Sequence, residues 1–194
     1  MHDEFSLSRD SGGEWEHFRR DVTSVDLLLR SEFPTAGHSL IVDYHFNFWP
    51  GEIAGLSVIV SPGELGREME TCAASAFRAI GYRIEPDPPF DVSNTVPWDV
   101  ATLTAHERIE MLHRVRSALE VARAEAAVEI DPSIRGGMPV IRGTRIGVYE
   151  LADIAAHETV ETILVSFPML TTAMIESAKI YARAHPLKSG TARD

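Results

Sequence analysis

The feature that most constrains this chain is the run DPSIRGGMPVIRGTRIGV at residues 131–148. It holds three arginines, four glycines and two prolines. Glycine permits tight turns and proline fixes the backbone angle φ, so a run rich in both predicts a defined backbone conformation. Arginines placed along such a backbone can contact a specific partner. The VIRGTRI part predicts a strand, a tight turn with Gly143 at positive φ, and a second strand. Arg142 and Arg145 would then flank one turn.

Three short helical patterns follow this run with little spacing between them. Apolar residues recur at helical intervals over 149–157, 158–167 and 171–183. Pro168 predicts the end of the second helix, and Thr171 can cap the third. Two short helices joined by a tight turn form a helix-turn-helix, whose second helix can enter the major groove of DNA.

The run and the helices resemble domain-of-unknown-function family 433 over residues 129–186. Members of that family share a Gly-Gly-Lys-Pro-Val-Ile-Arg-Gly-Thr-Arg core and a later Tyr-Pro-x-Leu-Thr segment. Here the core reads GGMPVIRGTR, with Met138 where lysine is usual, and the later segment reads FPMLT. The resemblance implies a winged or tri-helical DNA-binding domain. It also implies an antitoxin of a bacterial toxin–antitoxin pair, whose toxin partner is often a PIN-type nuclease.

A DNA-binding reading assigns the arginines of the turn to phosphate and the polar face of the third helix to the groove. The alternative for Arg142 and Arg145 is an ion pair with Glu129, Asp131 or Glu150 that fixes the turn. The alternative for the third helix is an ordinary amphipathic surface helix. In both cases Ile175, Ala178 and Tyr181 would face the core. The candidate DNA-binding residues are Arg135, Arg142, Thr144, Arg145, Thr171, Thr172, Glu176, Lys179 and Arg183.

The N-terminal part predicts a small α+β domain. Two β-rich runs, 40–48 and 56–60, suggest neighbouring strands, and Ser61-Pro62-Gly63-Glu64 predicts the capped start of a helix reaching residue 80. Residues 82–84 could add a third strand. The proline-rich segment 85–102 predicts irregular structure. Thr104-x-x-Glu107 predicts a second capped helix to about residue 127, with a narrow stripe of Ile109, Leu112, Arg116 and Leu119.

Charge is divided unevenly along the chain. The formal net charge is −11, and residues 1–126 hold 11 arginines, no lysine and 21 acidic residues. Residues 127–194 hold 7 basic and 8 acidic residues. The acidic part would repel DNA and suit a basic protein partner. Aromatic anchors for such a partner would be Phe46, Phe48, Trp49, Phe90 and Trp98, whose alternative use is a small core.

Other classes of protein find little support in the residues. No window approaches the ~18 apolar residues of a membrane helix, and the N-terminus is acidic, so we expect a cytoplasmic protein without membrane contact. The single cysteine, Cys72, excludes an internal disulfide. His45 and Asp43 alone are too few for a metal site, and no set of catalytic residues converges. We therefore expect neither an enzyme nor a cofactor.

The sequence thus predicts an α+β fold, in which a small N-terminal α+β domain is joined by a helix to a C-terminal winged or tri-helical helix-turn-helix domain. The favoured function is an antitoxin-like regulator of a bacterial toxin–antitoxin system. Its C-terminal domain would bind operator DNA as a homodimer, and its acidic N-terminal domain would hold a toxin or mediate dimerisation. The alternative is a protein-interaction or immunity module that does not touch DNA. The expected boundaries are a mobile tail at 1–20, an acidic α+β domain at 21–101, a connector helix at 102–127 and the helix-turn-helix domain at 128–188.

Overall fold

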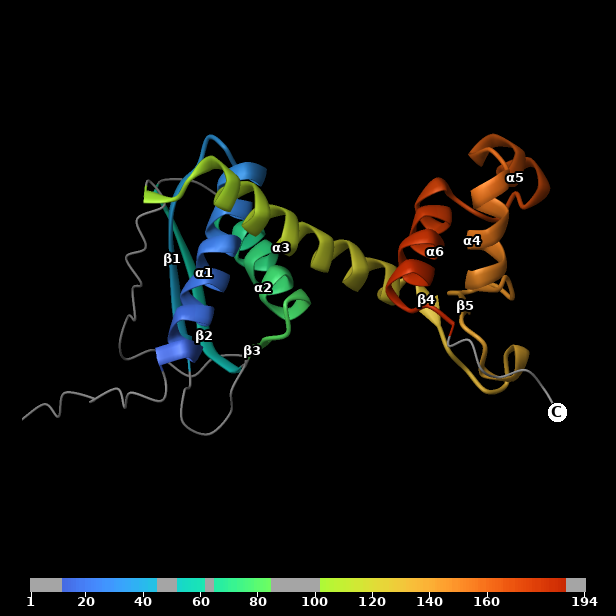
Figure 1. Ribbon diagram of the computed structural model, residues 1–194, viewed down its shortest axis with the longest axis horizontal. Coiled ribbons are helices and arrows are strands. Elements are labelled where there is room, and N and C mark those ends of the chain that lie inside the picture. The colour runs from blue at the N-terminus through green and yellow to red at the C-terminus, as the bar shows by residue number, and fades with distance from the viewer. Residues whose placement is uncertain (1–11, 45–51, 62–64, 85–101, 188–194) are drawn as a thin grey trace, which may run out of the picture. The chain divides into compact units, whose positions relative to one another are not determined.

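The computed structural model describes residues 12–44, 52–61, 65–84 and 102–187 (Figure 1). The chain divides into two compact units, Met1–Leu119 and Glu120–Asp194, here called the N-terminal unit and the C-terminal unit. Each unit combines helices with a small sheet, so the fold is α+β, as predicted. Within the described ranges, every helix is too short or too polar to cross a membrane.

The sheet of the N-terminal unit has the strand order β1-β2-β3. Strands β1 (Gly37–Tyr44) and β2 (Glu52–Ser61) pair antiparallel, which confirms the predicted neighbouring strands. Their register shifts between Asp43 and Tyr44, as at a β-bulge. The short strand β3 (Arg83–Ile84) lies parallel to β2, where a third strand was expected.

Helix α1 (Gly12–Glu32) corrects the predicted tail. The prediction that residues 1–20 form a mobile tail is wrong from Gly12 onward, because Phe18 lies in the helix and is buried. Phe18, Val22, Val25 and Leu29 are spaced at intervals of one helical turn, and all four are buried in the core of the unit. The polar residues around Gly13 mask this pattern in the sequence.

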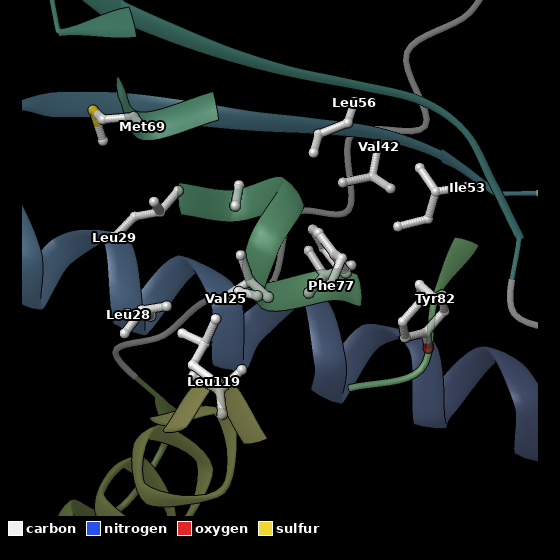
Figure 2. Close-up of a cluster of buried hydrophobic side chains, with 14 of the residues drawn as sticks. Val25, Leu28, Leu29, Val42, Ile53, Leu56, Met69, Phe77, Tyr82 and Leu119 are labelled. Atoms are coloured by element: carbon white, nitrogen blue, oxygen red, sulfur yellow. The ribbon is translucent and has the colours of Figure 1, made fainter. Parts of the chain in front are cut away.

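Helix α2 (Gly66–Ala79) begins later than predicted. Ser61, the expected capping residue, is the last residue of β2, and the N-cap is Leu65, which makes no side-chain capping hydrogen bond. The helix buries Met69 and Phe77 in the core that it shares with α1 and the β1–β2 pair, and Figure 2 shows both among the side chains of this core. Cys72 is half-buried at the edge of the same core.

Helix α3 (Ala105–Ala126) begins at the predicted capping box. The Thr104 hydroxyl accepts from the Glu107 main-chain N–H at 3.2 Å, and Glu107 Oε2 accepts from the Thr104 N–H at 2.8 Å. The Thr104 hydroxyl also donates to Glu107 Oε2 at 2.7 Å, and this bond, together with the one from the Thr104 main-chain N–H, holds the pKa of Glu107 below its usual value. The buried stripe differs from the predicted one.

The buried positions of α3 that reach the N-terminal core are Val115 and Leu119, with Met111 also buried. Ile109, which was predicted to belong to the apolar stripe, is 66% exposed, so that part of the prediction is wrong. The division between the two units falls inside this helix, after Leu119. A connecting helix was expected at 102–127.

The C-terminal unit contains a two-stranded sheet, a 3₁₀ turn and three helices. Its elements are β4 (Val128–Glu129), η3 (Arg135–Gly137), β5 (Val140–Ile141), α4 (Val148–His157), α5 (Val160–Ser166) and α6 (Thr172–Ala184). The three helices confirm the three helical patterns. β4 pairs antiparallel with β5, which the sequence did not reveal because β4 has only two residues. Helix α4 packs chiefly against α6, and Ile175, Ala178 and Tyr181 are buried as predicted.

Candidate interaction site

Residues 131–148 are here called the arginine–glycine motif, and the first bend of their backbone passes through the left-handed region. Three consecutive residues have positive φ: Arg135 at 50°, Gly136 at 67° and Gly137 at 84°. The main-chain N–H of Gly137 donates to the Ile134 carbonyl at 3.0 Å. A non-glycine residue in this region is strained by about 1–2 kcal/mol, so Arg135 must be held there by other interactions.

Arg135 is held by Glu150, in the first turn of α4. Its guanidinium donates two parallel hydrogen bonds to the carboxylate, the Nη1–Oε2 bond measuring 2.6 Å. This contact lowers the pKa of Glu150 and raises that of Arg135. Gly147 leaves room for the pair, because a Cβ there would lie 2.7 Å from Arg135 Nη1. Arg135, a predicted DNA contact, is therefore directed at the protein itself.

The VIRGTRI turn is closed by backbone and threonine hydrogen bonds. The Thr144 N–H donates to the Ile141 carbonyl at 2.9 Å, and Gly143, the third residue of the turn, has φ 74° as a type II turn requires. The Thr144 hydroxyl donates to the same carbonyl and accepts from the Ile146 N–H. Thr144 thus fixes the turn. The strand before the turn and the turn itself are as predicted, but the predicted second strand is wrong, because after the turn only Gly147 forms an isolated bridge, to Val140.

Arg142 stabilises the junction between α3 and the small sheet. Its Nε donates to the Ala126 carbonyl at 2.9 Å and its Nη2 to the Val128 carbonyl at 2.8 Å. Ala126 is the last residue of α3, whose terminal carbonyls have no partner within the helix. Arg142 was expected to contact either phosphate or an acidic side chain. Its actual partners, two main-chain carbonyls, were not among these. The sequence gives no signal for these contacts, because β4 is needed to place these carbonyls.

We expect the Arg142→Ala variant to lower the free energy of unfolding of the C-terminal unit by about 1–2 kcal/mol, because two charge-assisted hydrogen bonds to carbonyls are lost. Arg145→Ala is the matched control. Arg145 lies three residues further along the same exposed turn and makes no hydrogen bond or ion pair within the described ranges. Urea titrations of both variants followed by circular dichroism measure the difference. Equal stability of the two variants would contradict a structural role for Arg142.

The remaining basic candidates are divided between paired and unpaired residues. On α6, Lys179 Nζ donates to Glu176 Oε1 at 2.8 Å, so these two predicted DNA contacts neutralise each other. Arg145 and Arg183 are exposed and make no hydrogen bond or ion pair with the part of the chain described. Three of the five basic candidates, Arg135, Arg142 and Lys179, are therefore engaged with the protein's own acids and carbonyls.

Helices α5 and α6 are each capped by a threonine and joined by residues 167–171. The Thr159 hydroxyl accepts from the Thr162 N–H, and the Thr171 hydroxyl accepts from the Met174 N–H, both at 3.3 Å. The capping role expected of Thr171 is confirmed. Thr172, the first residue of α6, is exposed.

The surface of these helices is acidic. From Ile146 to Ala178 the chain holds no lysine or arginine, and it holds five acidic residues: Glu150, Asp153, Glu158, Glu161 and Glu176. Hydrogen bonds from its own main-chain N–H and from Thr159 lower the pKa of Glu161, which keeps this carboxylate charged. Glu150 and Glu176 are paired with Arg135 and Lys179, so the negative charge that repels phosphate comes from Asp153, Glu158 and Glu161 on and beside α4 and α5.

Buried ionic groups in the N-terminal unit were missed by the sequence reading. Asp21 is 1% exposed, accepts from the Tyr82 hydroxyl at 2.8 Å and lies 2.7 Å from Arg114 Nη1. His38 Nε2 lies 2.8 Å from Asp26 Oδ1, and the His38 side chain is 1% exposed. The one available signal was that Asp21 and Asp26 fall within an apolar helical pattern.

A cavity of about 530 Å³ lies between the N-terminal parts of α1 and α3. Both acidic and basic side chains line it, and Thr104 already binds one of the carboxylates, that of Glu107. This mixture of charges favours no single class of ligand. The residues lining the cavity are Gly13, Glu16, His17, Arg20, Leu103, Glu107, Glu110, Met111 and Arg114.

The aromatic partner-binding residues predicted for the N-terminal part lie outside the described residues. They are Phe46, Phe48, Trp49, Phe90 and Trp98. His45, which with Asp43 was weighed as a metal pair, also lies outside them. Among the described residues, no group of three or more His, Cys, Asp or Glu side chains is placed to hold a metal ion.

The C-terminal unit is thus a small α+β unit in which a rigid arginine–glycine turn precedes three short helices. Residues 128–182 match the family described as "Protein of unknown function (DUF433)", which confirms the resemblance over this segment. A protein of Sinorhizobium fredii (strain NBRC 101917 / NGR234), "Uncharacterized protein y4eO", is 37% identical over 107 residues. That alignment covers 50% of this chain and 48% of the relative, so the chain spans about half the length of the relative that it matches. No solved structure matches the chain.

Proposed function

We propose that this protein is a protein-binding regulator of the antitoxin or immunity type, whose C-terminal unit contacts a partner protein rather than DNA. The observation that carries the proposal is the absence of lysine and arginine from residues 146–178, the segment that forms α4, α5, the connecting turn and the first half of α6. In a helix-turn-helix protein the first helix crosses the phosphate backbone and the start of the second helix enters the groove. Phosphate contacts by lysine and arginine supply most of the non-specific affinity for DNA.

The arginine–glycine motif supports the same proposal. Arg135 is paired with Glu150, and Arg142 donates to main-chain carbonyls, so each already has partners that phosphate would have to displace. Exposed ion pairs are weak, and Lys179 could leave Glu176. The Arg135–Glu150 pair is held more firmly than the Lys179–Glu176 pair, because it has two parallel hydrogen bonds and Gly147 leaves space for it.

Operator binding by a homodimer is the second candidate, and the arrangement of α5 and α6 favours it. Helix α6 turns its apolar residues inward and exposes Thr172, while Arg145 and Arg183 are available for phosphate. In this reading, as in the first, the partner protein would be a toxin, and the resemblance implies a PIN-type nuclease. The two candidates differ in whether the C-terminal unit needs DNA at all.

The test is fluorescence anisotropy of the full chain with its own upstream DNA and with a scrambled duplex, at several salt concentrations. We expect equal, weak binding to the two duplexes, with Kd no tighter than about 10⁻⁶ M near physiological salt. The Arg145→Ala/Arg183→Ala variant should behave as wild type. Tighter binding to the native DNA would establish the second candidate instead, particularly if this variant lowered the salt slope by about one or two.

A further inference from the structure

We propose that the partner docks where α5 meets α6, and that the docking segment of the partner is basic with apolar anchor residues. The surface, here called the α5–α6 corner, consists of Glu161, Val165, Pro168 and Met169. The inference rests on the proposed function, because it names the surface that a protein partner would use.

Apolar exposure at this corner is concentrated. Val165 is 81% exposed and Met169 63% exposed, and Pro168 between them is also exposed. Single exposed apolar residues are ordinary on a protein surface, whereas three within five residues form a patch. Methionine and proline next to a short helix offer an adaptable apolar contact that a partner side chain can cover.

The turn that presents these residues is firmly held. The Leu170 N–H donates to the Phe167 carbonyl at 3.0 Å, and Leu170 is 5% exposed. Phe167 packs against the same core as Ile175. Because Phe167 and Leu170 point inward, Pro168 and Met169 at the tip of the turn are held outward. A partner that binds there would lose little affinity in ordering the turn.

The charge around the corner indicates that the docking segment of the partner is positively charged. Glu161 lies one helical turn before Val165 on α5, so the two side chains share one face of the helix. Glu158 immediately precedes α5 and is also exposed. Since the whole stretch 146–178 lacks lysine and arginine, no cation of this stretch offsets these carboxylates. Lysine or arginine beside the apolar anchors of the partner would complement this surface.

A second copy of this chain fits the corner less well. A symmetric contact would bring Glu161 and Glu158 of one copy close to the same residues of the other. The chain also carries a net charge of −11, so the two copies would repel each other on approach. Charge complementarity therefore favours a different, basic protein.

The experiment is co-expression of the full chain with the product of the adjacent gene, followed by co-purification and titration calorimetry of the complex. We expect Val165→Glu and Met169→Glu each to weaken the complex by about tenfold or more, since a carboxylate would be buried against an apolar and basic surface. Ile130→Glu is the matched control, because Ile130 is 61% exposed in the same unit and lies outside the corner. These exposed positions should leave the circular dichroism spectrum unchanged.

A second measurement tests the sign of the partner's charge. Glu161→Lys should weaken the complex by several-fold and reduce its dependence on salt, because a charged contact is reversed. Hydrogen exchange of the wild-type complex should show protection over residues 158–170. Stronger binding by Glu161→Lys would overturn a basic docking segment.

The outcomes separate this inference from the proposed function. Failure of the adjacent gene product to bind at all overturns both. A complex that Val165→Glu and Met169→Glu leave intact overturns the docking site but keeps the proposed function. Dimerisation of the purified chain that Val165→Glu abolishes would identify a second copy as the occupant, and this too overturns a basic foreign partner.

Discussion

Replacement of Arg114 by leucine should lower the free energy of unfolding of the N-terminal unit by about 3 kcal/mol or more. Asp21 is 1% exposed, and its Oδ1 lies 2.7 Å from Arg114 Nη1, an ion pair although the angle is not that of a hydrogen bond. The other oxygen accepts from Tyr82 and lies 3.5 Å from His17, which is 66% exposed. Removal of the guanidinium would leave a buried carboxylate without its nearest cation.

The matched control for Arg114 is Arg116→Leu. Arg116 lies two residues away on α3, is also 45% exposed and pairs at 2.8 Å with Glu32, which is itself 47% exposed. Because water can replace that pair, the loss should stay below about 1 kcal/mol. Differential scanning calorimetry should show a fall of about 10 °C or more in Tm for Arg114→Leu alone. Equal shifts in the two variants would show that Asp21 does not depend on Arg114.

The Ile175→Ala variant should destabilise the C-terminal unit by about 2–5 kcal/mol. Ile175 is 0% exposed and lies at the centre of the core formed by α4, α5 and α6, so its truncation removes buried surface and leaves a cavity. Helix α6 and the α5–α6 corner should then order poorly. Binding of a partner at that corner should weaken as a consequence.

Ile130→Ala is the control for this cavity, because the same truncation at a position 61% exposed should change stability by less than about 0.5 kcal/mol. Hydrogen exchange read by mass spectrometry locates the effect. Faster exchange is expected over α4 and α6 in Ile175→Ala. Unchanged exchange there would mean that the core closes around the smaller side chain.

Sequence patterns predicted most of the C-terminal unit because its determinants are local. Thr171 caps α6 and Gly143 permits the turn, and both properties follow from a few neighbouring residues. In the N-terminal part the β1–β2 pair was also predictable from its apolar runs. The start of α2 was not, because Ser61 satisfies a capping pattern but is drawn into β2 by pairing with Gly37. Pairing with a distant segment overrides local preference.

The roles of the arginines depended on contacts distant in sequence. Arg135 is separated from Glu150 by 15 residues, and Arg142 from Ala126 by 16. The sequence indicates that these arginines lie on a backbone with fixed turns, but it does not show which residues their side chains contact. Asp21 and Tyr82, 61 residues apart, are the extreme case. The predicted aromatic anchors of the N-terminal part lie outside the described residues and stay predictions.

The absence of lysine and arginine between Ile146 and Ala178 has a practical consequence at the bench. Trypsin cleaves after these two residues, so complete digestion releases the segment from Ile146 to Lys179, with all of α4, α5 and the corner, as one long peptide. Amine-reactive cross-linkers cannot react at the corner, because it carries no lysine. Pepsin digestion and carboxylate-directed cross-linking, which use the side chains that this surface does carry, are the chemistries that can map whatever binds there.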